Sequence, residues 1–161
     1  MERVSVLVDV QNVYYTTRSA YQRSFDYNLF WQIVGEGREV VNAYAYAIDR
    51  GDEKQRQFQT ILRAIGFTVK LKPFIQRADG SAKGDWDVGI TIDALTCADD
   101  SDVIVLVTGD GDFALLADRI RQHYKKKVEV YGVPSLTAKA LVDSADTFVS
   151  IDQNLLLQPK R

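Results

Sequence analysis

The sequence of 161 residues has one cysteine, Cys97, and one histidine, His123. A lone cysteine cannot form an intramolecular disulfide framework, and it fits a reducing compartment. The usual zinc sites need several thiolates or imidazoles, so zinc chemistry is also excluded. Any catalytic chemistry in this chain must therefore come from carboxylates.

The chain also lacks an excess of positive charge. It carries 20 Lys and Arg against 22 Asp and Glu, for a net charge of -2, so no overall basic field would hold a nucleic acid. The apolar runs are of strand length, well short of the roughly 20 residues of a membrane span, and the first is too short for a signal peptide. We expect a cytoplasmic protein without a membrane partner, in which any nucleic-acid site would be a local basic patch.

Proline is scarce as well, with 3 residues, and no linker, repeat or low-complexity stretch divides the chain. Its length fits one domain. We expect a single domain over residues 1–152 and a C-terminal tail over residues 153–161.

Short apolar runs rich in Val and Ile alternate with helical patterns. Such runs are typical of strands buried on both faces of a parallel sheet. The alternation predicts right-handed crossovers and a doubly wound, mainly parallel sheet of five or six strands, with the polar segment 75–84 as its longest loop. Strands are predicted at 4–8, 40–48, 67–74, 103–107, 128–133 and 147–151, and helices at 26–34, 52–65, 85–98, 113–124 and 136–145.

Acidic residues follow two of these strands at the point where each strand ends. Asp9 and Asn12 follow the first strand, and Thr108, Asp110 and Asp112 follow the fourth. Ligands of open α/β sheets bind beyond the carboxyl ends of the strands, so these side chains are expected to meet in one crevice. A helix cap and a turn residue are the common alternative uses of the last two acids. Those uses leave the acid and amide after the first strand unexplained.

The start of the predicted helix 85–98 supplies a third group of acids. Asp85 is predicted to cap this helix. Asp87 lies in its first turn, where the helix dipole favours negative charge, and we predict that it reaches the metal. Asp93 lies about 240° around the helix from Asp87. It is either a partly buried acid behind the metal ligands or a hydrogen-bond anchor between elements.

Carboxylates brought together raise each other's pKa unless a cation neutralises them. An all-oxygen site of this kind suits Mg²⁺ or Mn²⁺. We predict that Asp9, Asp87, Asp110 and Asp112 bind such an ion and are the catalytic residues. The chemistry indicated is metal-assisted hydrolysis of a phosphodiester.

Contacts to the substrate are predicted from residues around these acids. An amide and a hydroxyl would hydrogen-bond the phosphate or a metal-bound water, and basic residues near the strand ends would hold further phosphates. Tyr14 and Tyr15 would either stack on bases or belong to the core and its rim. The predicted substrate-binding residues are Asn12, Thr108, Lys83 and Arg50.

The motifs together resemble the NYN domain of the PIN-like nuclease superfamily, and most nearly its bacterial LabA-like branch. The resemblance rests on Asp-x-x-Asn after the first strand, on Lys-Gly followed by two aspartates, and on Thr-Gly-Asp-Gly-Asp-Phe after a Val-rich strand. These motifs occur in the family's order over residues 4–113. An Asp-Trp pair precedes Asp87 where the family usually has one residue, so Asp85 competes with Asp87 for the same role.

The resemblance implies a PIN-like three-layer α/β/α sandwich and a metal-dependent endoribonuclease acting on RNA, expected to be single-stranded. Asp9, Asn12, Asp87, Asp110 and Asp112 match the family's acidic centre. The alternative function is an RNA-binding or regulatory protein-interaction module that retains a weak or inactive metal site and acts through partners, for example as a homodimer. Metal-dependent RNA cleavage separates the two.

Three other phosphate-handling α/β folds fit less well. A haloacid-dehalogenase-like phosphatase needs a second acid two residues after its nucleophile, and position 11 is Gln. A receiver domain needs paired acids at the first strand. A Toprim domain normally carries Glu there.

Overall fold

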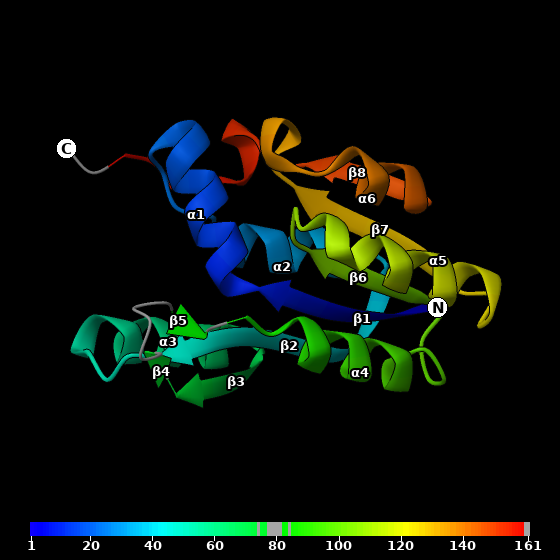
Figure 1. The fold of residues 1–161 in the computed structure, drawn as a ribbon, viewed down its shortest axis with the longest axis horizontal. Helices are drawn as coiled ribbons and strands as arrows, with labels where there is room; N and C mark the ends of the chain where they lie inside the picture. Colours follow the sequence, from blue (N-terminus) through cyan, green and yellow to red (C-terminus); the bar gives the residue numbers. More distant parts are fainter. Residues whose placement is uncertain (74, 77–81, 84, 160–161) are drawn as a thin grey trace.

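Six parallel strands form the central sheet in the order β3-β2-β1-β6-β7-β8 (Figure 1). The computed structural model describes residues 1–73, 75–76, 82–83 and 85–159. For residues 73, 75, 76, 82 and 83 it describes the backbone alone. The six strands are β1 (Glu2–Asp9), β2 (Arg38–Asp49), β3 (Thr68–Pro73), β6 (Val103–Val107), β7 (Lys127–Gly132) and β8 (Thr147–Ser150).

Helices cover both faces of this sheet, which makes the fold a three-layer α/β/α sandwich and confirms the predicted fold class. Short 3-10 turns, η1 (Gly111–Phe113), η2 (Pro134–Leu136) and η3 (Gln153–Leu155), join or end the elements. The helices are α1 (Val10–Tyr21), α2 (Tyr27–Gly35), α3 (Glu53–Ile65), α4 (Asp87–Cys97), α5 (Ala114–Gln122) and α6 (Lys139–Ser144).

Alternation along the strands separates two cores. Val4, Val6 and Val8 of β1 pack with α1, α2 and α3 on one face. Leu7 of the same strand packs with α4, α5 and α6 on the other. All four side chains are at most 1% exposed, and burying one apolar side chain of this size stabilises the fold by about 1.5–3 kcal/mol.

The six predicted strands and five predicted helices are confirmed within a few residues, but the prediction missed α1. This helix is rich in β-branched and aromatic residues, including Val13, Tyr14 and Thr17, which have low helix propensity. It forms because Asp9 caps it and because Val10, Val13 and Thr17 are buried against the sheet. Tertiary packing therefore overrides local preference at this position.

The polar segment 75–84 and the C-terminal residues contain structure that the sequence analysis did not specify. The polar segment 75–84 contains an antiparallel strand pair, β4 (Ile75–Gln76) and β5 (Ala82–Lys83), which is too short to show a strand pattern in the sequence. At the C-terminal end, Leu155 and Leu156 are buried, and Phe25 forms a β-bridge with Leu156. No helix in the described part of the chain is long and apolar enough to cross a bilayer.

The strand order reverses its direction between β1 and β6. The chain moves outward from β1 to β2 and β3, then returns through α4 to β6 and moves outward in the other direction. Ligands of such sheets bind at the carboxyl ends of the strands where the order reverses. In this fold that position lies beyond Asp9 and Val107.

Candidate metal centre

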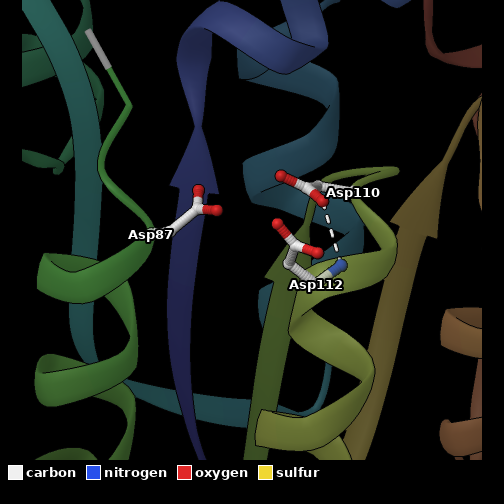
Figure 2. Close-up of side chains that lie close together, drawn as sticks. All are labelled: Asp87, Asp110 and Asp112. Carbon is white, nitrogen blue, oxygen red and sulfur yellow. Dashed lines mark hydrogen bonds between the residues drawn. The ribbon is translucent and has the colours of Figure 1, made fainter. Parts of the chain in front are cut away.

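Three carboxylates converge beyond the carboxyl ends of β1 and β6 (Figure 2). Asp87 comes from the first turn of α4, and Asp110 and Asp112 come from the loop between β6 and α5. One oxygen from each of the three lies within 4.8 Å of the others. No ion pair among the described residues includes any of them.

The loop that carries Asp110 and Asp112 is held on several sides. The Asp110 carboxylate accepts the Asp112 N–H at 2.9 Å, which caps the 3-10 turn η1. Asn12 Oδ1 accepts the Gly109 N–H at 2.8 Å. A Cβ on Gly109 would lie 2.5 Å from the Leu136 carbonyl oxygen, so only glycine fits there. The Asp112 carboxylate caps neither η1 nor α5 and points toward Asp87 instead (Figure 2).

Asp9 lies beside this group, at the end of β1. Its Oδ2 accepts the Thr108 hydroxyl at 3.1 Å, and its Oδ1 accepts the Asn12 N–H at 3.5 Å. Burial raises the pKa of Asp9 to about 6, although both hydrogen bonds lower it, and the nearby charges of Asp110 and Asp85 raise it further. Asp9 therefore contributes to the electrostatics of the group without belonging to the three mutually close carboxylates.

The carboxylates destabilise one another in their charged forms. Burial, followed by the charges of Asp110, Asp85, Asp9 and Asp112, raises the pKa of Asp87 to about 6. A cation bound between such carboxylates would stabilise their charged forms. Four oxygen-bearing acids without a nitrogen or sulfur ligand match the donor preference of Mg²⁺ and Mn²⁺.

The raised pKa of Asp9 predicts how stability depends on pH. The folded protein binds a proton at Asp9 more tightly than the unfolded chain does, so ionisation of Asp9 destabilises the fold. In metal-free buffer, the free energy of unfolding should fall as pH rises from about 4 to above 6, by at most about 3 kcal/mol from this group. Urea unfolding across this range should show the slope, and Asp9→Asn should reduce it. An unchanged slope in that variant would contradict the assignment.

Thr108 gives a second, sharper test of the same carboxylate. Its side chain is buried, and its hydroxyl donates to Asp9 and accepts the Asp110 N–H at 3.2 Å. Thr108→Val should raise the pKa of Asp9 further and cost about 1.5–3 kcal/mol of stability at pH 7, because a charged acceptor loses its donor. Urea unfolding should show a smaller loss at pH 4.5, and Thr108→Ser should behave like the parent. Equal losses at both pH values would count against the role.

The acids Asp93 and Asp85 lie apart from the three converging carboxylates in different ways. Asp93 Oδ2 accepts the Tyr46 hydroxyl at 2.7 Å and the Lys70 ammonium at 2.6 Å, so this residue joins α4 to β2 and β3. Of the two predicted alternatives, these contacts match a hydrogen-bond anchor between elements. Asp85 is exposed, and the N-cap of α4 is Trp86 rather than Asp85 as predicted. The reason is that the helix begins at Asp87, whose N–H donates to Asp85 at 3.3 Å.

The predicted substrate-binding residues are in different situations. Thr108 and Asn12 use their side-chain oxygens to hold Asp9 and the Gly109 loop. Arg50 is exposed and follows β2 at the same edge of the sheet as Asp9. The side chain of Lys83 lies outside the described residues.

Trp86 positions the start of α4, a role that sequence analysis missed. Its indole N–H donates to the Ala47 carbonyl at 2.8 Å, and its ring lies 5.2 Å from that of Tyr46. A Cβ on Gly89 would meet this ring at 2.5 Å, so the glycine one turn later makes room for it. The signal in the sequence was a Trp directly before Asp87 with a Gly three residues on.

Comparison with known proteins identifies the family of this chain. The NYN domain family matches residues 3–152. The chain is 29% identical over 120 residues to the low amplitude and bright protein LabA of Synechococcus elongatus, which covers 71% of this chain. The match spans 64% of that relative, less than two thirds of its length. A crystal structure of a protein of unknown function from Vibrio parahaemolyticus is 62% identical, with a TM-score of 0.93 and coverage of 97% of this chain and 96% of the other. The chain is therefore a member of the NYN domain family, in its LabA-like branch.

Proposed function

We propose that the protein is a metal-dependent ribonuclease that hydrolyses phosphodiester bonds of single-stranded RNA. The observation that carries this proposal is the convergence of Asp87, Asp110 and Asp112, whose carboxylate oxygens approach within 4.8 Å without a cationic side chain paired to them among the described residues. Membership of a PIN-like nuclease family supports the same chemistry.

The donor set fits Mg²⁺ or Mn²⁺, because it consists of carboxylate oxygens from two separate segments with a further carboxylate beside them. Asp87, Asp110 and Asp112 would hold the ion, and Asp9 would complete the centre from β1. A bound divalent ion supplies a water of lowered pKa and neutralises charge on the phosphate.

The protein's own contribution is to hold these carboxylates in place. Thr108 and Asn12 fix the carboxylate of Asp9, and Trp86 fixes the start of α4 next to Asp87. The hydrogen bond from Gly109 to Asn12 and the close packing of Gly109 against Leu136 fix the loop that carries Asp110 and Asp112. Such an arrangement is built before substrate arrives, which is how positioning contributes to catalysis. Arg50, at the same edge, would contact a phosphate of the substrate.

The test is cleavage of a fluorescent single-stranded RNA by the purified protein. We expect cleavage with Mn²⁺ or Mg²⁺ and none with EDTA. A DNA oligonucleotide of the same sequence, assayed in parallel, measures the preference for RNA. If the protein binds the RNA but does not cleave it at any metal concentration, the ribonuclease proposal fails in favour of an RNA-binding or regulatory module.

A further inference from the structure

A pocket of about 770 Å³ lies between α1, α3 and the start of α2. These helices pack on the face of the sheet opposite α4 and α5, so the pocket lies across the sheet from the converging carboxylates. Residues that follow the ends of β1 and β2, among them Gln11 and Arg50, line it, so it lies toward the end of the sheet to which the strands point. The volume is in the range of small-molecule sites, roughly 300–1,000 Å³.

Several aromatic rings line this pocket. Tyr14 and Tyr15 on α1 are 53% and 55% exposed, and their ring centroids lie 5.6 Å apart. Tyr27 and Phe58 lie deeper, with ring centroids 5.5 Å apart. Tyr14 and Tyr15 therefore present much of their ring surface at the pocket, although the Arg18 guanidinium lies 5.9 Å from the Tyr14 ring centroid.

The pocket comes close to Asp9 at one end. Val10 and Gln11 line the pocket and directly follow Asp9, which ends β1. On the pocket side, the charge of Asp9 acts on the hydroxyl of Tyr27, where burial and this charge together raise the pKa of the phenol. A nucleic-acid strand with a phosphate at the carboxylates would therefore pass close to this pocket where it extends beyond Asp9.

The charges around the pocket favour a neutral group over a phosphate. Arg50 and Lys54 are offset by Asp26, Asp52 and Glu53. The two aspartates already cap α2 and α3, where they accept the N–H groups of the third helical residues. A flat neutral ring with polar edges fits better, because amide side chains such as those of Asn28 and Gln59 also line the pocket.

We propose that this pocket binds one nucleobase of the RNA strand whose phosphate lies at the acidic centre. The inference rests on the proposed function. Stacking on aromatic side chains suits any base, since every base has a flat face, so the pocket contributes affinity and register rather than strict sequence selectivity.

The experiment titrates adenosine and uridine monophosphate into the ¹⁵N-labelled protein in EDTA, followed by NMR. Without a divalent ion the carboxylates repel phosphate, so binding reports the pocket. We expect amide shifts confined to residues of α1, α3 and the start of α2. Combined Tyr14→Ala and Tyr15→Ala should weaken binding about tenfold or more, the scale of one lost stacking contact. Tyr124→Ala, after α5 at the opposite edge of the sheet, is the matched control and should bind like the parent.

A second variant guards against misfolding of the first. Ile61 is 53% exposed and lines the pocket, so Ile61→Trp adds bulk without disturbing the core and should also weaken binding. No shifts at millimolar nucleotide, or shifts around Asp110 instead, would overturn the inference. So would sedimentation showing that the parent is a dimer that the tyrosine variant dissociates, because the face would then be a contact between copies.

Failure of the inference and failure of the ribonuclease proposal are distinguishable. If the parent cleaves RNA while both pocket variants keep its KM and mononucleotides do not bind, only the pocket inference falls. If mononucleotides bind in the pocket but the parent never cleaves RNA with Mn²⁺, the nuclease proposal falls and a nucleobase site remains.

Discussion

Replacing Asp110 by asparagine should reduce Mn²⁺-dependent RNA cleavage at least about 100-fold, because residues that merely support a metal ligand already cost 10–100-fold when mutated. The asparagine keeps an Oδ1 that can accept the Asp112 N–H, so the loop should retain its shape while the charge is lost. The measurement is the initial rate on the fluorescent RNA at saturating Mn²⁺.

The matched control for this variant is Asp99→Asn. Asp99 is an exposed aspartate just after the C-terminal end of α4, so it carries the same change of charge away from the converging carboxylates. Its cleavage rate should equal that of the parent. If Asp110→Asn also cleaved at the parental rate, the three carboxylates would not be the catalytic centre.

Mn²⁺ should stabilise the folded protein strongly, since the carboxylates repel one another without it. At 100 times the dissociation constant, a ligand that binds only the folded state contributes about 2.7 kcal/mol. For a chain of this size that corresponds to a rise of about 5–10 °C in the midpoint of thermal unfolding. A thermal melt with increasing Mn²⁺, compared with EDTA, measures the shift.

The same melts separate repulsion from metal binding. Asp110 raises the pKa of Asp87 and of Asp9, so Asp110→Asn should melt higher than the parent in EDTA and respond less to Mn²⁺. Asp99→Asn should do neither. A full Mn²⁺ shift in a variant with Asp87, Asp110 and Asp112 all changed to Asn would place the ion elsewhere.

Much of the fold was predictable because its strands have a clear sequence pattern. Fully buried parallel strands such as Val103–Val107 are continuous apolar runs, and the helices between them have apolar faces and caps. The helix α1 was not predictable from local preference, because its Val, Thr and Tyr residues favour strands and only packing against the sheet makes it a helix. Long-range contacts decided that element.

Asp110 and Asp112 could be placed at the candidate centre because they follow a buried strand, and Asp87 because it lies in the first turn of a predicted helix. Their partners could not be predicted, since a hydrogen bond between Asn12 and Gly109 joins positions 97 apart in the chain. The two alternatives for Asp93 could be separated only once Lys70 of β3 and Tyr46 of β2 were seen to reach it. The aromatic pocket could not be predicted from the sequence, because several of its lining residues belong to α1, which the sequence analysis missed.

Gly109 packs tightly against the connection between β7 and α6, which lies far along the chain from the loop that carries Asp110 and Asp112. The Gly109 carbonyl accepts the Ala138 N–H at 3.0 Å, and the Leu136 carbonyl leaves no room for a side chain on the glycine. This connection bears no carboxylate, yet the loop that carries Asp110 and Asp112 packs directly against it. Enlarging a residue there should displace Asp110 and Asp112 relative to Asp87, so a substitution outside the acids would also reduce any activity of the proposed centre.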